Sequence, residues 1–233
     1  MLKNAVRCGL LVLFAIAGLV RADQPWTFSD NTRYIALGDS LAAGYGAMPT
    51  TNGYAYLLYQ RGVYDKTSNT IFANAAVPGA TSRDVLDHQL PQAITRFAPH
   101  VVTLSVGGND LLAIFAGADP SQVLPQFQSN LTGILCGLRL ALPQSRIYIH
   151  NLYDIPEITG GPGSPAFNVL VAFNQIIGGV AQACGVHMAD VFSAFAGKTG
   201  LLLIERNGAG QFEVHPSNAG YRAMAAAFEA VLQ

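Results

Sequence analysis

Charged residues are scarce in this sequence. They make up 12% of its 233 residues, and neither sign dominates, because 13 Lys and Arg face 14 Asp and Glu. This balance excludes a polycationic nucleic-acid-binding protein. The chain also lacks tandem repeats and low-complexity tracts. Because 51% of the residues are hydrophobic, a disordered chain is excluded, and the length suits one large domain or two small ones.

Long hydrophobic runs are absent, apart from one near the N-terminus. Cys8–Val20 is an uninterrupted apolar run of 13 residues, which is short for a membrane span of about 20 residues. Lys3 and Arg7 precede or border the run, and Ala22 follows it before a polar segment. A basic start, a short apolar stretch and a small residue at the cleavage point are typical of a secretory signal peptide.

We therefore predict that residues 1–22 are a signal peptide and that 23–233 form a single domain, which is secreted or periplasmic. The alternative is an uncleaved N-terminal anchor, which Arg21 beside the cleavage point favours. After cleavage the domain has no stable membrane span. It carries 10 basic and 14 acidic residues, which gives a net charge of −4.

Cysteine is rare as well. Cys136 and Cys184 are the two that remain beyond the signal peptide. In an exported protein such a pair is compatible with a disulfide, and their apolar helical surroundings are equally compatible with two buried thiols. No CxxC pair and no His pair with zinc-ligand spacing occurs. The sequence therefore predicts neither a metal site nor a cofactor.

Short apolar runs alternate with longer stretches of helical periodicity. The runs indicate buried strands at 34–37, 70–75, 101–106, 146–151 and 186–189. The helical stretches span 82–97 (with a bend at Pro91), 121–142, 164–184 and 217–232. This alternation predicts an α/β fold, in which helices cover both faces of a parallel sheet. Functional residues of such folds lie at the carboxyl ends of the strands.

Four loops near those strand ends contain residues suited to acyl transfer. They are Gly38–Leu41 (Gly-Asp-Ser-Leu), Asn74–Thr81, Gly107–Asp110 (Gly-Gly-Asn-Asp) and His215-Pro216. Together they offer a serine nucleophile, backbone N–H groups, a side-chain amide donor and a base. Each loop alone also has a purely structural interpretation, such as a helix cap or a tight turn.

These four segments, in this order, resemble the conserved blocks of the GDSL, or SGNH, hydrolase family of esterases and lipases. The resemblance implies a three-layer α/β/α fold of flavodoxin-like type with a five-stranded parallel sheet. It implies that Ser40 is the nucleophile and His215 the general base. The oxyanion hole would consist of the N–H groups of Ser40 and Gly79 and the side-chain amide of Asn109. No cofactor is implied.

The chain departs from the family pattern at the acid that orients the histidine. The family commonly has an aspartate three residues before the histidine, where this chain has Phe212. Glu213 is the nearest carboxylate, and in an extended segment it points to the same side as His215. Glu213 is therefore the candidate acid. The alternative is a solvated Glu213, with a backbone carbonyl or a water orienting the imidazole.

Other polar residues near the motifs are assigned structural roles. We expect Asp39 and Asp110 to be turn or cap residues, and His150 to be structural or exposed. The sequence does not determine where the acyl group of the substrate would bind. Apolar residues after the motifs either line an acyl groove or belong to the core. They are Tyr45, Tyr54, Tyr56, Leu111, Leu112, Ile114 and Phe115.

The expected function is hydrolysis of a small-molecule, lipid or carbohydrate ester through an acyl-enzyme, with a short-to-medium acyl or acetyl group. One alternative is a lysophospholipase or thioesterase that acts on longer chains. Another is a catalytically silent binding module on the same scaffold.

Overall fold

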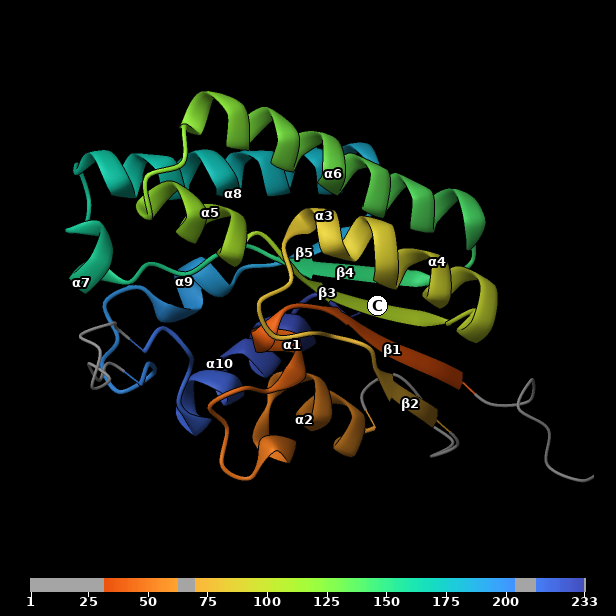
Figure 1. The fold of residues 1–233 in the computed structure, drawn as a ribbon. Helices are drawn as coiled ribbons and strands as arrows, with labels where there is room; N and C mark the ends of the chain where they lie inside the picture. Colours follow the sequence, from red (N-terminus) through yellow and green to blue (C-terminus); the bar gives the residue numbers. More distant parts are fainter. Residues whose placement is uncertain (1–31, 63–69, 204–212, 233) are drawn as a thin grey trace, which may run out of the picture. The chain divides into compact units, whose positions relative to one another are not determined.

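Five strands form the central sheet of the computed structural model, which describes residues 32–62, 70–203 and 213–232 (Figure 1). The strands are β1 (Thr32–Gly38), β2 (Thr70–Asn74), β3 (Val101–Ser105), β4 (Arg146–His150) and β5 (His187–Ala189). Their order in the sheet is β2-β1-β3-β4-β5, and every neighbouring pair is parallel. The predicted signal peptide, residues 1–22, lies outside the described residues.

The strands are apolar on both sides because both faces of the sheet are covered. In β1, Ile35 and Leu37 pack into the core on one face, whereas Tyr34 and Ala36 pack into the core on the other. All four side chains are at most 3% exposed. Side chains alternate along a strand, so a strand buried on both faces appears in the sequence as a continuous apolar run.

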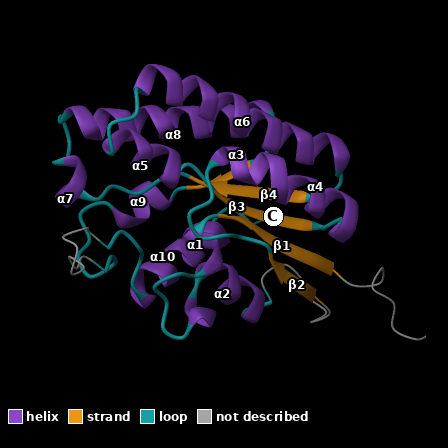
Figure 2. Ribbon diagram, viewed as in Figure 1, coloured by secondary structure: helices purple, strands orange, loops and turns teal. Residues whose placement is uncertain are grey.

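The long helices lie on one face of the sheet. We call this face the upper one and the opposite face the lower one, and the upper and lower cores are the apolar side chains packed on these two faces. Figure 2 shows this layer above the strands, with α6 and α8 side by side. The elements of this layer are α3 (Ser82–Asp84), η3 (Val85–Gln89), α4 (Leu90–Gln92), η4 (Ala93–Phe97), α5 (Gly108–Phe115), α6 (Pro120–Ala141), α7 (Pro156–Thr159) and α8 (Pro165–Ala183).

Shorter helices cover the opposite face, where they bury aromatic side chains such as Tyr54, Tyr221 and Phe228. Among the described residues this layer contains α1 (Ser40–Ala43), η2 (Thr50–Asn52), α2 (Tyr54–Gln60), α9 (Val191–Phe195) and α10 (Asn218–Glu229). The predicted α/β fold with helices on both faces of a five-stranded parallel sheet is therefore confirmed.

The predicted helix at 82–97 is helical but not uniform. It alternates α-helical segments with two π-helical segments, η3 and η4. At the end of η3 the Leu90 N–H donates to the Val85 carbonyl, five residues back instead of four. Pro91 follows at once and has no N–H to continue the α-helical pattern, which explains why regular hydrogen bonding is interrupted here.

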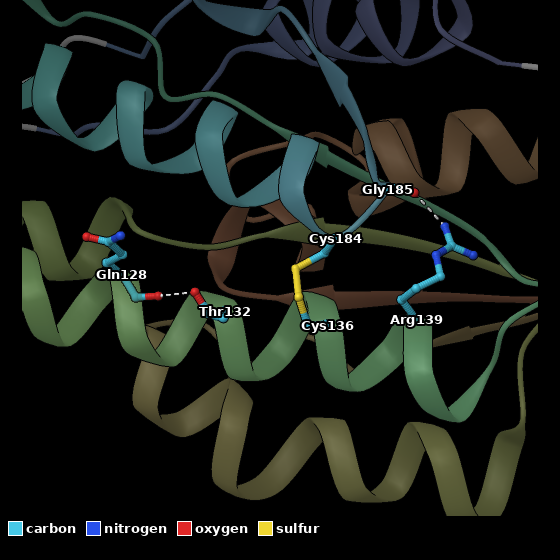
Figure 3. The surroundings of a disulfide bond; sticks show 6 residues. All are labelled: Gln128, Thr132, Cys136, Arg139, Cys184 and Gly185. Atoms are coloured by element: carbon cyan, nitrogen blue, oxygen red, sulfur yellow. Dashed lines mark hydrogen bonds between the residues drawn. A yellow bond between two sulfur atoms is a disulfide. The ribbon is translucent and has the colours of Figure 1, made fainter.

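A disulfide joins two elements of the upper layer. Cys136 in α6 is bonded to Cys184, which follows the last residue of α8, and their Cα atoms are 5.0 Å apart (Figure 3). One turn further along α6, Arg139 donates to the Gly185 carbonyl and fastens the same junction. Of the two states that the sequence allows, the structure has the disulfide.

Among the described residues, α8 is the one helix that is long and apolar enough to cross a membrane. It has 19 residues and a mean hydropathy of 1.3. Its inner side places Leu170, Phe173 and Ile177 in the core above the sheet. A helix that covers the sheet of an α/β domain meets the same criteria of length and composition, and one side of α8 is packed in this way.

Candidate active site

The turn after β1 carries Ser40 to the carboxyl edge of the sheet. Gly38 has φ +125°, and a Cβ there would lie 1.8 Å from the Ser105 carbonyl oxygen, so only glycine fits. Asp39 caps α1, because its side chain accepts a hydrogen bond of 3.0 Å from the Leu41 N–H. Ser40 is then the first residue of α1, where its hydroxyl and its N–H are held by a short, fixed turn.

His215 and Glu213 approach Ser40 from the segment before α10. The Ser40 Oγ lies 2.7 Å from His215 Nε2, and His215 Nδ1 is hydrogen-bonded to Glu213 Oε1. With Nδ1 donating to the carboxylate, Nε2 of the neutral ring is the acceptor that faces the serine hydroxyl. Of the alternatives for orienting His215, the structure has Glu213.

Glu213 is suited to remain ionised in this position. Partial burial raises its pKa. Hydrogen bonds from the His215 ring and from backbone N–H groups, and attraction to the imidazole when it is protonated, outweigh that effect, so the net result is a lowered pKa. The backbone donors are the N–H groups of Val214 and His215, at 3.0 and 3.1 Å from Oε1. A carboxylate held by three donors stays charged and fixes the imidazole ring.

Two tyrosines hold the histidine segment against the rest of the site. The Tyr153 hydroxyl donates to the Val214 carbonyl at 2.7 Å. The Tyr45 ring packs on the imidazole of His215, with ring centroids 4.5 Å apart. Tyr221 in turn donates to the Tyr45 carbonyl at 2.6 Å. The histidine segment is thus held by Tyr45 and Tyr153, and Tyr221 fixes Tyr45 in turn.

Gly79 and Asn109 line the same cleft as Ser40, Gly79 from the loop after β2 and Asn109 from the start of α5. The Asn109 side-chain amide donates one hydrogen bond of 2.8 Å to the Ala80 carbonyl, which ties the start of α5 to the loop that contains Gly79. An amide group has two N–H bonds, so the second remains for a ligand. The Val77 N–H donates to the Gly38 carbonyl at 2.9 Å and joins the same loop to the Ser40 turn.

Asp110 in α5 forms hydrogen bonds that join this helix to α3. Its carboxylate accepts hydrogen bonds from the Ser82 N–H at 2.9 Å and from the Ser82 hydroxyl at 2.6 Å. Burial raises the pKa of Asp110, although the Ser82 donors act in the opposite direction. This contact fits the structural role that the sequence assigns to Asp110, and it holds Asn109 beside the Gly79 loop.

A second buried polar group lies directly behind the Ser40 turn. Ser105 Oγ is 2.8 Å from Asp39 Oδ1 and 2.9 Å from His150 Nε2, and the three residues stand at the carboxyl ends of β1, β3 and β4. Burial raises the pKa of Asp39 to about 7 and lowers that of His150 to about 4. His150 is therefore structural and fully buried, not exposed.

The hydrogen-bonded residues open onto a cleft of about 430 Å³. Ser40, Gly79, Asn109, Glu213 and His215 all line it. Its remaining wall is largely apolar and comes from α5, from the segment after β4 and from α8. The apolar members of that wall include Leu111, Leu112, Phe115, Leu152, Ile155, Ile158 and Leu170.

A model of the GDSL-like lipase/acylhydrolase family matches residues 36–223. The chain belongs to this family. It is therefore a hydrolase by family, and the recognised range includes Ser40, Gly79, Asn109, Glu213 and His215. A search among curated proteins finds no match to the chain.

Solved structures share the fold of this GDSL-like hydrolase at low sequence identity. An esterase, EstA, from Pseudoalteromonas sp., inhibited by monoethylphosphonate, is 21% identical with a TM-score of 0.62, covering 86% of this chain and 96% of its own. Axe2, an acetylxylan esterase from Geobacillus stearothermophilus, is 19% identical with a TM-score of 0.68 and coverages of 86% and 94%. Phospholipase A1 from Streptomyces albidoflavus NA297 is 19% identical with a TM-score of 0.63 and coverages of 86% and 99%.

The structure divides the residues that the sequence proposed for an acyl groove. In this GDSL-like hydrolase, Tyr45, Leu111, Leu112 and Phe115 line the cleft. Tyr54 is instead fully buried in the lower core. Tyr56 packs edge-on against Phe72, and Ile114 packs against the upper core.

Sequence reasoning missed the part of the wall that follows β4. Leu152, Tyr153, Ile155 and Ile158 lie in or near loops that carry no recognisable motif. The sequence did contain one indication: these residues follow β4, the strand next to β3, and loops at the carboxyl ends of adjacent strands meet at one edge of the sheet.

Proposed function

We propose that this protein is a carboxylic ester hydrolase that works through a Ser40 acyl-enzyme. The observation that supports the proposal most directly is the hydrogen-bonded series from Ser40 to His215 to Glu213 at the mouth of an apolar cleft. A serine hydroxyl beside a neutral imidazole, which is oriented by an ionised carboxylate, is the arrangement that activates serine for nucleophilic attack.

In the first half of the reaction, Ser40 Oγ attacks the ester carbonyl while His215 Nε2 takes its proton. The carbon–oxygen double bond becomes a single bond, and negative charge develops on the former carbonyl oxygen. The N–H groups of Ser40 and Gly79 and the amide of Asn109 are the donors proposed for that oxygen. His215 then gives its proton to the leaving alcohol, and the acyl group remains on Ser40.

Water completes the cycle by the same steps. His215 takes a proton from the water as it attacks the acyl-enzyme, and the second tetrahedral intermediate releases the carboxylic acid and regenerates the Ser40 hydroxyl. Throughout, Glu213 holds the Nδ1–H and stabilises the positive charge that forms on the imidazole. Its lowered pKa keeps the carboxylate ionised for this role.

The proposed substrate is a neutral ester with a short-to-medium acyl group. The apolar wall formed by Leu111, Leu112, Phe115 and Ile158 supports an alkyl chain as the occupant of the cleft. The volume of about 430 Å³ supports a chain of limited length. Acetyl esters remain within the proposal, and the fold is shared with an acetylxylan esterase.

A second candidate is a lysophospholipase or thioesterase that accepts longer acyl chains. The fold is shared with a phospholipase A1, and the apolar lining of the cleft supports lipid esters. The two candidates differ in chain-length preference, because each buried CH₂ contributes about 0.8 kcal/mol until the cleft is filled.

We also propose that the protein acts outside the cytoplasm, with residues 1–22 removed as a signal peptide. The disulfide between Cys136 and Cys184 supports this location, since disulfides persist in oxidising compartments.

The test is hydrolysis of p-nitrophenyl esters from acetate to palmitate by the mature protein and by the Ser40→Ala variant. We expect activity with a maximum at short-to-medium chains, and loss of that activity in the variant. A maximum at the long chains supports the second candidate. A folded parent that hydrolyses none of these esters contradicts the proposal and favours a silent binding module.

A further inference from the structure

Gln89 makes an unusual contact with the backbone just before the nucleophile. Its side chain is 6% exposed. The Gln89 Oε1 accepts a hydrogen bond of 2.7 Å from the Gly38 N–H, and its Nε2 donates one of 2.8 Å to the Gly38 carbonyl. We call these two hydrogen bonds the Gly38 clamp. One side chain thus engages both polar backbone groups of a single residue.

The clamp lies where the β1–β2 ladder ends. The last paired residues are Ala36 and Asn74, and beyond them the Val77 N–H still donates to the Gly38 carbonyl at 2.9 Å. The Gly38 N–H is buried and needs an acceptor, which the Gln89 Oε1 provides, while the Gln89 Nε2 is a second donor to the Gly38 carbonyl. The clamp therefore completes the hydrogen bonding of the last residue of β1, just before the Ser40 turn.

The local helix geometry at Gln89 is itself exceptional. Gln89 is the last residue of the π-helical segment η3, and the wide turn closes from Leu90 to Val85. Such π-helical turns inside α-helices are uncommon and occur frequently at functional sites. Here the π-helical segment ends at Gln89, the residue that holds Gly38, two positions before Pro91.

The conformation of Gly38 matters because Ser40 supplies two functional groups. Gly38 has φ +125° and is wedged against the Ser105 backbone, two residues before Ser40. A small rotation at Gly38 moves both the Ser40 hydroxyl and the Ser40 N–H. The hydroxyl must stay within reach of His215, at 2.7 Å in this structure, while the N–H must point at the developing oxyanion.

We infer that Gln89 is a positioning residue for the nucleophile: the Gly38 clamp sets the direction of Ser40 and raises the rate of acylation. Gln89 does not line the active-site cleft and touches no reacting atom. The inference rests on the proposed function, in which Ser40 attacks an ester.

The test uses the mature protein with two substitutions of Gln89 and one matched control. Gln89→Met keeps a side chain of similar length but removes both hydrogen bonds. Gln89→Glu keeps the acceptor and regains the donor only when its carboxyl group is protonated. Gln92→Met, in the following α4 helix, makes the same replacement at an exposed position. Active sites are titrated with a phosphonate ester, and denaturant curves establish that each variant is folded under the assay conditions.

We expect Gln89→Met to lower kcat about 10- to 100-fold, with KM changed by less than about twofold, because positioning acts on the chemical step. We expect Gln92→Met to match the parent. For Gln89→Glu, the ratio of its kcat to that of the parent should rise as the pH is lowered from about 8 to about 5, since the protonated carboxyl group restores the clamp. Taking the ratio removes the titration that both proteins share.

A merely structural role would lower the folded fraction and leave kcat per active site unchanged. A folded Gln89→Met variant with the kcat of the parent, or a Gln89→Glu ratio that is constant with pH, would overturn the inference. If Gln89→Met does not fold, the Gln89→Glu ratio decides. An inactive parent contradicts the proposed function itself, whereas an active parent with unaffected variants contradicts the clamp alone.

Discussion

Ser40 and His215 are 175 positions apart in the sequence and 2.7 Å apart in the structure. Each is useful only through its neighbours: Glu213 selects the ring nitrogen that faces the serine, and Asp39 caps the helix that begins at Ser40. The carboxylate beside the imidazole is partly exposed, with 33% of its side-chain surface accessible, while the imidazole is 15% exposed. The carboxylate that orients the imidazole is therefore more exposed to solvent than the imidazole itself.

Asn109→Ala tests the oxyanion donor. We expect kcat/KM to fall by roughly 10²–10³, which corresponds to about 2.7–4 kcal/mol of lost transition-state stabilisation. The fold should persist, because the lost contact is one hydrogen bond to the Ala80 carbonyl. Steady-state kinetics on the best p-nitrophenyl ester, with a denaturant curve as control, measures both quantities. Turnover close to that of the parent would exclude Asn109 from the oxyanion hole.

Glu213→Gln tests the residue that replaces the aspartate usual in the family. The amide cannot carry the negative charge that stabilises the imidazolium, so we expect kcat to fall by at least about tenfold while KM changes little. The measurement is kcat and KM at neutral pH with the same ester. Unchanged kcat would remove Glu213 from the catalytic arrangement and leave it as a local backbone contact.

Asp39→Asn tests the buried carboxyl group behind the nucleophile. Burial raises the pKa of Asp39 from 3.8 to about 7, so between these pH values the folded protein keeps a proton that the unfolded chain has lost. The parent therefore loses stability as the pH rises through this window. Asparagine does not titrate. We therefore expect the free energy of unfolding of the variant, minus that of the parent, to increase from pH 4 to pH 7.

Urea denaturation at three pH values in this window measures that difference. The lowered pKa of His150, about 4 against 6.5, acts in the opposite direction, because the unfolded chain binds its proton first. This contribution is common to both proteins and cancels in the comparison. A difference that does not vary with pH would show that Asp39 is ionised in the folded protein.

Helices and strands position the site through their ends. β1, β3 and β4 end at Gly38, Ser105 and His150, and the turns that follow them bring polar groups to one edge of the sheet. α5 then starts at this edge and runs away from it. With a rise of 1.5 Å per residue, Phe115 lies about 9 Å along the axis from Asn109, so α5 forms one wall of the cleft along its length.

Leu112→Trp tests whether α5 limits the length of the acyl chain. We expect the ratio of kcat/KM for octanoate over acetate to fall by about tenfold or more, because excluding two CH₂ groups removes about 0.8 kcal/mol each. The measurement is the p-nitrophenyl ester series. The matched control is Leu140→Trp, since Leu140 on α6 is 85% exposed and does not line the cleft. Equal profiles for the two variants would place the acyl chain elsewhere.

On the scale of the whole described structure, two cores hold the sheet from its two faces. The upper core combines the strands with η3, α6 and α8, and the lower core combines them with α2, α9 and α10. The disulfide adds a covalent link within the upper layer, between α6 and the end of α8. Because these two helices are separated by β4 and its long connection, the bond closes a large loop.

The double variant Cys136→Ala, Cys184→Ala tests how much the disulfide contributes to the free energy of unfolding. The bonded cysteines are 48 residues apart, for which chain entropy predicts a loss of about 4 kcal/mol in the free energy of unfolding. Neither cysteine lines the cleft, so kcat should stay near that of the parent at moderate temperature. Urea denaturation of the variant, the parent and the reduced parent checks the expectation. Equal midpoints for all three would contradict it.

Much of the architecture follows from the sequence alone. The apolar runs predicted all five strands to within two residues at every end, because strands between two helical layers consist largely of apolar residues. The ordered motifs predicted the family. Short helices such as α2, α7 and α9 were not predicted, since a few residues of helix depend more on tertiary packing than on their own periodicity.

What the sequence determined by itself was local: which segments are apolar on both faces, where glycine is required, and which residue types occupy the loops. Only the tertiary structure decided the rest: the hydrogen bond between Glu213 and His215, the Cys136–Cys184 disulfide, the part of the cleft wall that follows β4, and the hydrogen bonds between Gln89 and Gly38. These contacts depend on where side chains point and on which strand ends lie next to each other in the sheet. The order of residues does not give either of these, because the distance between two residues along the chain does not fix their distance in space.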